Sequence, residues 1–571
     1  MRDNEAAADL LEEFADRLEA AGVEYKPRAY RRAADAVRDH PRPITALAEE
    51  GLEAVREIEG VGEAIGEKLV EYVETGTIEE LAALREELPV DIDALTRVEG
   101  LGPKRVGTLY EALGIETLDD LEAAAEAGDI REVEGFGATS ERNILEGIPF
   151  ARTAAARHLL SEVRPVADEI LAALEAATAV ERSSVAGSIR RWRETIGDID
   201  VLVATTEAAA VSETLGDFAF VDAVLEAGER KASVRTTAGI RADFRFVDPS
   251  TYGAALVYFT GSKDHNVQLR QRAIDRGLKV NEYGVFRGED RLAGETEATL
   301  YDALDLAWIP PELREARGEV EAAAADALPE LLEASDLHGD IHVHTDWSDG
   351  RATIQEMVDA AAAYGHEYVA ITDHAVGPGV VADAGLDADD LRAQADAVAE
   401  VAAEAGVEVF HGVEENIAAD GSLTLPEDVL DELDLVIASP HAALDQHRET
   451  ATDRLVRAVE HPAVDVLGHP TGRKLGRREG LSIDVERVAT AAAAADVALE
   501  VNSHPVRLDL AGEAVQTAVA TGASIAISTD AHVPREFELL RYGLHTARRG
   551  WAEAADVVTA RDADGVRGWL G

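Results

Sequence analysis

The chain has 571 residues, contains no cysteine and carries a formal net charge of −58 at pH 7. The lack of cysteine excludes disulfides and thiolate metal sites, so any metal must be held by His, Asp and Glu. No apolar run approaches the ~20 residues that span a membrane. The acidic, amphipathic N-terminus differs from a signal peptide, and a reducing cytoplasm is the expected location.

A charge this negative normally argues against a polyanionic partner. Acidic residues are spread along the whole chain, however, and the 54 basic residues comprise 7 lysines and 47 arginines. This composition is typical of proteins that stay soluble in concentrated salt, where a Debye length of ~3 Å at about 1 M screens the repulsion of DNA. We therefore expect a halophilic source, with an acidic mesophilic protein as the alternative.

Residues 5–22 and 28–39 have helical periodicity, and one pattern then recurs at 58–73, 98–113 and 133–148. Each copy has an apolar residue and Glu, then Gly-x-Gly, then an amphipathic helix, which resembles the helix-hairpin-helix motif. Glycine permits the tight turn, and the next helix presents backbone N–H groups that bind a DNA phosphate without a basic surface. For the third copy a structural role is an open alternative. The predicted DNA contacts are Gly60, Gly62, Gly100, Gly102, Lys104, Gly135 and Gly137.

Lys68 lies in the predicted helix after the first hairpin. A lysine can act as a Schiff-base nucleophile when neighbouring cations lower its pKa, and Lys26, Arg28 and Arg31 are candidates for that role. The alternative, in which Lys68 contacts a phosphate or is solvated, is the one that the residues favour.

The stretch from Gly187 to Asp200 reads GSIRRWRETIGDID and runs into an apolar segment typical of a buried strand. Asp198 and Asp200 are two residues apart, so a strand points both carboxylates to one face, where a divalent ion such as Mg²⁺ relieves their repulsion. Asp243 alternates with apolar residues on a second predicted strand. Three such aspartates can hold two ions that activate a 3′-hydroxyl and stabilise a leaving pyrophosphate.

The GSIRR and GDID sequences, Asp243, YFTGS at 258–262 and GLKVNE at 277–282 resemble family X DNA polymerases, and the resemblance covers residues 1–317. It implies a nucleotidyltransferase-fold palm and a thumb, with Asp198, Asp200 and Asp243 as catalytic ligands of Mg²⁺ or Mn²⁺. Lys68 matches the family's lyase lysine, but Ala64 stands where a second lysine is expected. The implied nucleotide-binding residues are Gly187, Ser188, Arg191, Tyr258, Phe259, Gly261, Ser262, Asn266 and Arg270.

Residues 310–339 are rich in Ala and Glu and predict connecting helices rather than a core. Thirteen of the sixteen histidines follow residue 335, which indicates a domain boundary. His342 and His344 share one face of a predicted strand. Short apolar strands that end in polar residues then alternate with Ala-rich helices, a pattern that predicts a barrel with its ligands at the C-terminal strand ends.

Residues 336–571 resemble the PHP (polymerase and histidinol phosphatase) domain in their HxH, TDH, GVEEN and DAH sequences. The resemblance implies a distorted (β/α)₇ barrel with three ions, Mn²⁺ or Zn²⁺, and 3′→5′ exonuclease or 3′-phosphatase chemistry. Arg507 is a candidate for phosphate binding or a surface residue, and His411 and His504 lie outside the pattern. The implied metal ligands are His342, His344, Asp349, His374, Glu414, His441, His469, Asp530 and His532.

We therefore expect a multidomain protein of the α+β and α/β classes. The expected domains are a helical, lyase-like DNA-binding domain (1–92), a fingers-like hairpin domain (93–150), a palm (151–248), a thumb (249–317), a linker (318–335) and a PHP domain (336–571).

The leading hypothesis is a monomeric repair enzyme that fills short gaps in DNA from dNTPs, as in base excision repair, and trims 3′ ends with its PHP domain. The alternative is a 3′-end-processing phosphoesterase whose polymerase part mainly positions DNA. A DNA-binding scaffold without turnover conflicts with the intact ligand sets, and a nucleotidyltransferase acting on small molecules does not need three hairpins.

Overall fold

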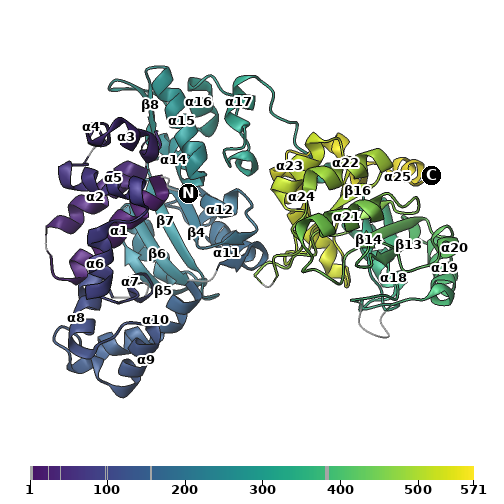
Figure 1. Ribbon diagram of the computed structural model, residues 1–571, viewed down its shortest axis with the longest axis horizontal. Coiled ribbons are helices and arrows are strands. Elements are labelled where there is room, and N and C mark those ends of the chain that lie inside the picture. Colours follow the sequence, from purple (N-terminus) through teal and green to yellow (C-terminus); the bar gives the residue numbers. More distant parts are fainter. Residues whose placement is uncertain are drawn as a thin grey trace. The chain divides into compact units, whose positions relative to one another are not determined.

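The computed structural model describes residues 4–23, 25–38, 40, 42–58, 60–96, 98, 101–154, 157–379, 385–476 and 478–571. Gly100, one of the predicted DNA contacts, lies outside these residues. The chain forms two compact units (Figure 1): the first holds residues 1–158, 163–187 and 196–308, and the second holds residues 159–162, 188–195 and 309–571. None of the described helices is both long and apolar enough to span a membrane.

The first unit begins with helices that pack around an apolar core. The helices expected at 5–22 and 28–39 are present as α1 and α2, whose rings Phe14 and Tyr30 stack with their centroids 4.6 Å apart. The elements are α1 (Asn4–Ala20), α2 (Lys26–Arg38), α3 (Ile44–Glu50), α4 (Leu52–Val55), α5 (Glu63–Thr75), α6 (Glu79–Glu87), α7 (Ile92–Thr96), α8 (Pro103–Leu113), α9 (Leu118–Ala127) and α10 (Ala138–Ala154).

A five-stranded sheet with the order β2-β4-β7-β6-β5 follows the helices. The two predicted aspartate strands are its neighbours β4 and β7, which run parallel and place Asp200 directly opposite Asp243. The elements are β1 (His158–Leu159), α11 (Leu160–Glu175), β2 (Arg182–Val185), α12 (Gly187–Arg190), β3 (Thr195–Ile196), β4 (Ile199–Ala204), α13 (Ala208–Thr214), β5 (Val221–Ala227), β6 (Lys231–Thr236) and β7 (Arg241–Val247).

The first unit ends with two helices and a small antiparallel sheet of the order β10-β9-β8. The YFTGS sequence closes one helix and caps the next, because the Ser262 hydroxyl accepts a hydrogen bond from the His265 amide at 3.2 Å. The elements are α14 (Tyr252–Thr260), α15 (Lys263–Asp275), β8 (Lys279–Asn281), β9 (Gly284–Arg287), β10 (Asp290–Ala293) and α16 (Glu297–Ala303).

The segment 309–338 in the second unit packs more closely than its Ala/Glu-rich composition predicts. It contains only one α-helix, α17 (Glu319–Ala324), among the described residues, together with two short 3₁₀ turns. Arg314 and Glu319 are fully buried, and Arg314 Nε donates to the Ile309 carbonyl at 2.9 Å. This segment is therefore part of a folded body rather than a free connector.

Seven parallel strands in sequential order, β11 to β17, form the core of the second unit. The sheet almost closes into a barrel, because Val343 bridges Ala531 in parallel and the His344 amide donates to the Ala531 carbonyl at 2.8 Å. The predicted barrel of alternating strands and helices is thus confirmed.

The barrel strands are β11 (Gly339–Val343), β12 (Tyr368–Ile371), β13 (Glu408–Asn416), β14 (Leu435–Ser439), β15 (Val466–Leu467), β16 (Ala498–Asn502) and β17 (Ile525–Ser528). Its helices are α18 (Ile354–Tyr364), α19 (Ala388–Ala402), α20 (Glu427–Leu430), α21 (Arg448–Val459), α22 (Val485–Ala495), α23 (Gly512–Ala520), α24 (Leu540–Arg549) and α25 (Ala563–Leu570). Six of the seven strands are buried along their whole length and β13 along most of its length, as expected for a parallel sheet covered by helices.

The short segment Ser188–Thr195 belongs to the second unit although its flanks belong to the first. The Trp192 ring stacks on His545 of α24 with a centroid distance of 3.5 Å and an interplanar angle of 8°. Arg549 NH1 donates to the Trp192 carbonyl at 3.0 Å, and Arg191 Nε donates to Glu315 at 3.0 Å. Ring stacking and ion pairs therefore hold this segment within the unit that contains the barrel.

Candidate metal centre and nucleotide site

The nine predicted metal ligands of the PHP region lie at the C-terminal ends of barrel strands. His342 lies in β11 and His344 directly follows it, Glu414 lies in β13, and Asp530 and His532 follow β17. The other four, Asp349, His374, His441 and His469, lie in the loops that follow β11, β12, β14 and β15. Parallel strands bring these ends to one mouth of the barrel.

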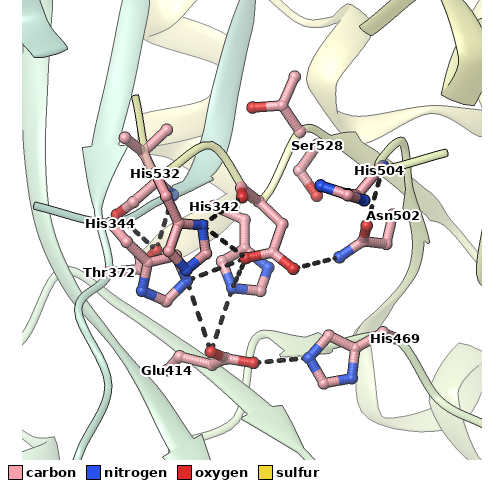
Figure 2. A network of polar contacts seen from close by, with 12 residues as sticks. His342, His344, Thr372, Glu414, His469, Asn502, His504, Ser528 and His532 are labelled. Carbon is pink, nitrogen blue, oxygen red and sulfur yellow. Dashed lines mark hydrogen bonds and ion pairs between the residues drawn. The ribbon is translucent and has the colours of Figure 1, made fainter. Parts of the chain in front are cut away.

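Eight of the nine residues form three groups in which one ligand atom of each residue lies within 4.8 Å of the others. Figure 2 shows the carboxylate of Glu414 among the imidazoles of His342, His344 and His469. His469 is in none of the three groups, although its Nε2 lies 2.8 Å from Glu414 Oε1. The groups are His344, Asp349, His374 and His532; His342, His344 and Asp530; and His374, Glu414 and His441.

Buried polar atoms without a hydrogen bond point to a cation at this place. They include Nε2 of His342, both ring nitrogens of His344, Oε2 of Glu414 and Nε2 of His441. An unmet buried polar group costs about 1–3 kcal/mol, so a cluster of them calls for a ligand that satisfies several at once. Imidazole and carboxylate donors together suit Zn²⁺ or Mn²⁺, and the residues therefore fit the three-ion site that the sequence implies.

The electrostatics of the cluster agree with this interpretation. Burial disfavours the charged form of Glu414, yet the imidazoles of His441, His374 and His342 hold its pKa well below the usual range. Burial likewise opposes ionisation of Asp530, but His342 and His344 lower its pKa well below normal. Both carboxylates are thus ionised and available to a cation near neutral pH.

Three residues that sequence reasoning missed orient the ligands. His342 Nδ1 lies 2.7 Å from the buried Glu500 carboxylate, and His441 Nδ1 lies 2.8 Å from Asn416 Oδ1. Asn502 donates to Asp530 at 2.9 Å. Because Glu500 can only accept, Nδ1 of His342 carries the proton and Nε2 faces the cluster.

A second buried network holds the loop that carries Asp349. Asp373 accepts from the Thr345 amide at 2.7 Å, the Thr345 hydroxyl at 2.6 Å, Ser348 at 2.5 Å and Gln394 at 2.6 Å. His411, one of the two histidines outside the ligand pattern, extends this network, with Nε2 3.1 Å from Gln394 Oε1. The other, His504, lines the pocket at the candidate metal centre.

The three predicted polymerase aspartates lie together at the start of β4 and β7. Asp198 precedes β4, and Asp200 and Asp243 are register partners. Gly187 has φ +56°, and a Cβ there would lie 2.2 Å from Asp200 Oδ2, so this turn requires glycine. These aspartates do not form a group with all ligand atoms within 4.8 Å among the described residues.

Asp243 is instead held by cations. Arg241 Nε donates to it at 2.8 Å and Lys231 Nζ lies at 3.5 Å. Burial raises the pKa of Asp243, but the bonds from Arg241 and Ser233 outweigh it and lower the pKa. Burial and the charge of Asp243 raise the pKa of Asp198. A divalent ion would relieve this repulsion, and the role of the three aspartates as metal ligands stays a prediction.

The predicted nucleotide-binding residues occupy two places. Ser188 and Arg191 lie on the segment that joins the second unit, whereas Gly261 and Ser262 separate α14 from α15. Tyr258, Asn266 and Arg270 line one small cavity in the thumb region, where Asn266 donates to the Tyr258 carbonyl at 2.7 Å. The rings of Tyr258 and Phe259 meet edge to face at 5.1 Å.

Four of the predicted hairpin glycines, Gly62, Gly102, Gly135 and Gly137, lie next to the helices or turns of their repeats. Gly62 and Gly102 are the residues just before α5 and α8, and Lys104 is exposed in the first turn of α8. Gly135 and Gly137 flank Phe136, over which Arg105 of α8 stacks at 4.2 Å. This contact gives the third hairpin a packing role, and its DNA contact stays a prediction.

Lys68 forms an ion pair with Glu80 at 2.6 Å. Burial lowers its pKa, but the hydrogen bond to Glu80 and the charge of Tyr30 raise it above the usual value overall. A lysine in this state is a protonated cation rather than an activated amine. Its catalytic role is an untested prediction.

Comparison with known proteins shows similarity to four domain families along the chain. Residues 2–78 match a helix-hairpin-helix domain, and residues 52–113 and 92–148 match a SAM-like helix-hairpin-helix tandem. Residues 255–315 match the DNA polymerase beta thumb, and residues 340–504 match the PHP domain.

The chain is 35% identical to the DNA polymerase/3'-5' exonuclease PolX of Bacillus subtilis (strain 168) over 570 residues, which cover 98% of each protein. It is 33% identical over 207 residues to a probable phosphatase of Thermoanaerobacter sp. (strain X514), covering 34% of this chain and 78% of that protein. It is 23% identical over 295 residues to DNA polymerase lambda of Rattus norvegicus, covering 48% of each.

The hairpins, the thumb and the histidine-rich barrel define a family X polymerase with an attached PHP domain, as the sequence implies. Because the similarity to the Bacillus protein covers nearly the full length of both, the chain belongs to the PolX family.

Proposed function

We propose that this protein is a DNA-directed DNA polymerase that fills short gaps in DNA repair and processes 3′ ends with a 3′→5′ exonuclease and 3′-phosphatase activity. The observation that carries the proposal is the convergence of eight of nine predicted ligands into three groups at the mouth of the barrel. The full-length similarity to a protein named DNA polymerase/3'-5' exonuclease supports it.

In the barrel, the chain's own residues prepare a phosphoester for hydrolysis. Glu500 and Asn416 fix the rings of His342 and His441, and Asp373 fixes the loop of Asp349. Bound ions would neutralise the phosphate and activate the attacking group there. The ligand carboxylates would thus hold the ions, and the strand ends keep the three ligand groups in place.

In the polymerase part, Asp198, Asp200 and Asp243 would hold two Mg²⁺ or Mn²⁺ ions. Bound ions would supply activation of the primer 3′-hydroxyl and stabilisation of the leaving pyrophosphate. Before the ions bind, Arg241 and Lys231 keep Asp243 ionised, because their positive charges favour the carboxylate over the acid. Ser188 and Arg191 are proposed to hold the triphosphate.

Two variants test the proposal on one gapped substrate with Mn²⁺ in high salt. Asp198→Ala should abolish nucleotide addition and spare 3′→5′ degradation, whereas His342→Ala should do the reverse. Primer extension by Asp198→Ala would show that the polymerase site lies elsewhere. Loss of both activities in His342→Ala would show that the two sites do not act independently.

The arrangement of Asp243 favours a second candidate function. Since Arg241 and Lys231 bind this carboxylate while the barrel ligands are already grouped, the chain can also act as a 3′-end-processing phosphoesterase whose polymerase part positions DNA. Absence of dNTP incorporation by the unaltered protein, together with intact 3′-end cleavage, would favour this candidate.

We further propose that the barrel takes three ions, Mn²⁺ or Zn²⁺, and that the enzyme works as a monomer on gapped or primed DNA with dNTPs. The excess of acidic residues and the scarcity of lysine support a halophilic, cytoplasmic setting, where salt screens the repulsion between the chain and DNA. Metal analysis of the purified protein, before and after chelation, tests the number and kind of ions.

A further inference from the structure

Four cationic side chains surround the metal centre of a chain whose net charge is −58. They line a cavity of about 550 Å³ that is also lined by Glu414, His374 and Asp530. One of only seven lysines in the protein is among them. The four are Arg351, Lys474, Arg507 and Arg535.

The four cations come from four different segments, which follow β11, β15, β16 and β17. Arg351 is two residues after Asp349, and Arg535 is three residues after His532. Lys474 lies in the loop after β15, and Arg507 in the turn after β16. No local sequence pattern requires positive charge at these places, so their convergence on one cavity is a property of the assembled site.

Arg507 differs from Arg351 and Arg535. Its Nε lies 3.5 Å from Asp530 Oδ2, and its side chain is 16% exposed. It therefore offsets a ligand carboxylate. Arg351 and Arg535 are exposed, and their side chains make no ion pair with the described part of the chain. In a protein with 112 acidic and 54 basic residues, two unpaired arginines beside one cavity are not explained by fold stability.

The chemistry of the cavity suits more than one phosphate. A guanidinium binds phosphate through paired N–H groups, and a lysine ammonium binds it as a point charge. The metal ligands account for one phosphate, the one to be cleaved. Arg351, Lys474 and Arg535 line the same cavity and bring positive charge to the phosphates that flank the scissile one.

We propose that Arg351, Lys474 and Arg535 form a strand-binding rim that holds the phosphates next to the scissile one. The rim makes the barrel selective for the end of a polynucleotide over an isolated phosphate ester. This inference rests on the proposed phosphoesterase function and adds the residues that set its substrate class.

The test compares a single-stranded oligonucleotide with bis(p-nitrophenyl) phosphate, a small diester that has no neighbouring phosphates, in the full-length protein with Mn²⁺. The triple variant Arg351→Ala, Lys474→Ala, Arg535→Ala should raise KM for the oligonucleotide at least about tenfold and leave kcat/KM for the small diester within about twofold. The slope of log(kcat/KM) against log[salt] should become shallower by about 2, since each contact to a single strand contributes about 0.7.

Arg487→Ala is the matched control, because Arg487 lies on α22, is paired with Asp453 and does not line the cavity. An equal loss on both substrates in the triple variant would mean that the cations only balance the ligand carboxylates. An unchanged KM for the oligonucleotide and an unchanged salt slope in the triple variant would also contradict the proposed strand-binding rim. If the unaltered protein cleaves neither substrate, the phosphoesterase proposal fails and the rim fails with it.

Discussion

The carboxylate of Glu500 determines which nitrogen of His342 faces the metal cluster. It is fully buried, and it also accepts from Ser528 and from the amide of His469. Burial raises its pKa, but the charge and hydrogen bond of His342 lower it below the usual value overall. One buried anion thus positions parts of three strand ends.

We expect Glu500→Gln to weaken metal binding and exonuclease activity about 10–100-fold, the range typical of changes to groups that orient metal ligands. Gap filling should be unaffected. Titration of the metal-depleted protein with Mn²⁺ measures the metal affinity, and an assay of 3′→5′ degradation then measures the exonuclease activity. Glu513→Gln, an exposed change on α23, serves as the control. Normal metal affinity in Glu500→Gln would remove Glu500 from this role.

Glu312 couples the stability of the second unit to pH. Burial would raise its pKa, but the hydrogen bond with His545 and the charge of Arg548 outweigh burial and lower the pKa to about 2. A carboxylate with a depressed pKa stabilises the fold fully at a pH above its pKa in the unfolded chain, near 4.5. It loses that contribution as the pH falls toward its folded pKa of about 2.

Glu312→Gln should therefore lower stability at pH 7 by about 3 kcal/mol at most. The difference in melting temperature from the unaltered protein should shrink between pH 4.5 and pH 2. Calorimetry across this range measures it. Glu50→Gln removes an exposed ion pair with Arg42 and should leave the melting temperature unchanged at every pH. A difference that persists at pH 2 would show that packing, not charge, is lost.

The candidate ligands of the barrel were predictable because they lie at or after the C-terminal ends of apolar strands and stand in HxH, TDH, GVEEN and DAH sequences that resemble the PHP domain. Glu500, Asn502 and Asn416 were not, since a polar residue inside a strand gives no sign of its partner. The i, i+2 spacing of Asn416 from Glu414, and of Asn502 from Glu500, was the available signal. The strand-binding rim was not predictable either, because it depends on loops that are distant in the sequence and that local patterns do not bring together. The hydrogen bond from Arg241 to Asp243 likewise gives no sign in the sequence pattern.

At the scale of elements, the close approach of α1 and α8 depends on one glycine. A Cβ on Gly107 would lie 2.0 Å from the Ala20 carbonyl oxygen. Ala20 is the last residue of α1, and Gly107 lies in the interior of α8. The two helices can pack at this distance only when position 107 has no side chain.

Gly107→Ala should destabilise the first unit by about 1–3 kcal/mol, because the added methyl group forces the helices apart. Helix propensity alone predicts the opposite sign, a gain of about 0.5–1 kcal/mol. Gly568→Ala is the matched control, since Gly568 lies inside α25 with no atom within 4 Å of a new Cβ. Thermal unfolding should show a loss at 107 and no loss at 568. A gain at both positions would contradict the close contact.

At the scale of the whole molecule, the charge of −58 predicts a dependence of stability on salt. The Debye length grows from ~3 Å at about 1 M to ~10 Å at 0.1 M, so acidic groups repel one another over longer distances in dilute salt. Dilution from about 3 M to about 0.1 M KCl should lower Tm by at least about 5 °C, which corresponds to about 2 kcal/mol or more for folded units larger than 250 residues. Circular dichroism measures it, and an unchanged Tm would favour a mesophilic origin.

The membership of Ser188–Thr195 in the second unit has a consequence for dissecting the protein. A fragment that begins in the linker would contain every metal ligand of the barrel, yet it would lack the indole that covers His545 and the carbonyl that Arg549 binds. A fragment that ends there would keep Arg191 but lose the partners that hold its segment. A border placed in the linker therefore separates pieces of one folded unit that are not contiguous in the sequence.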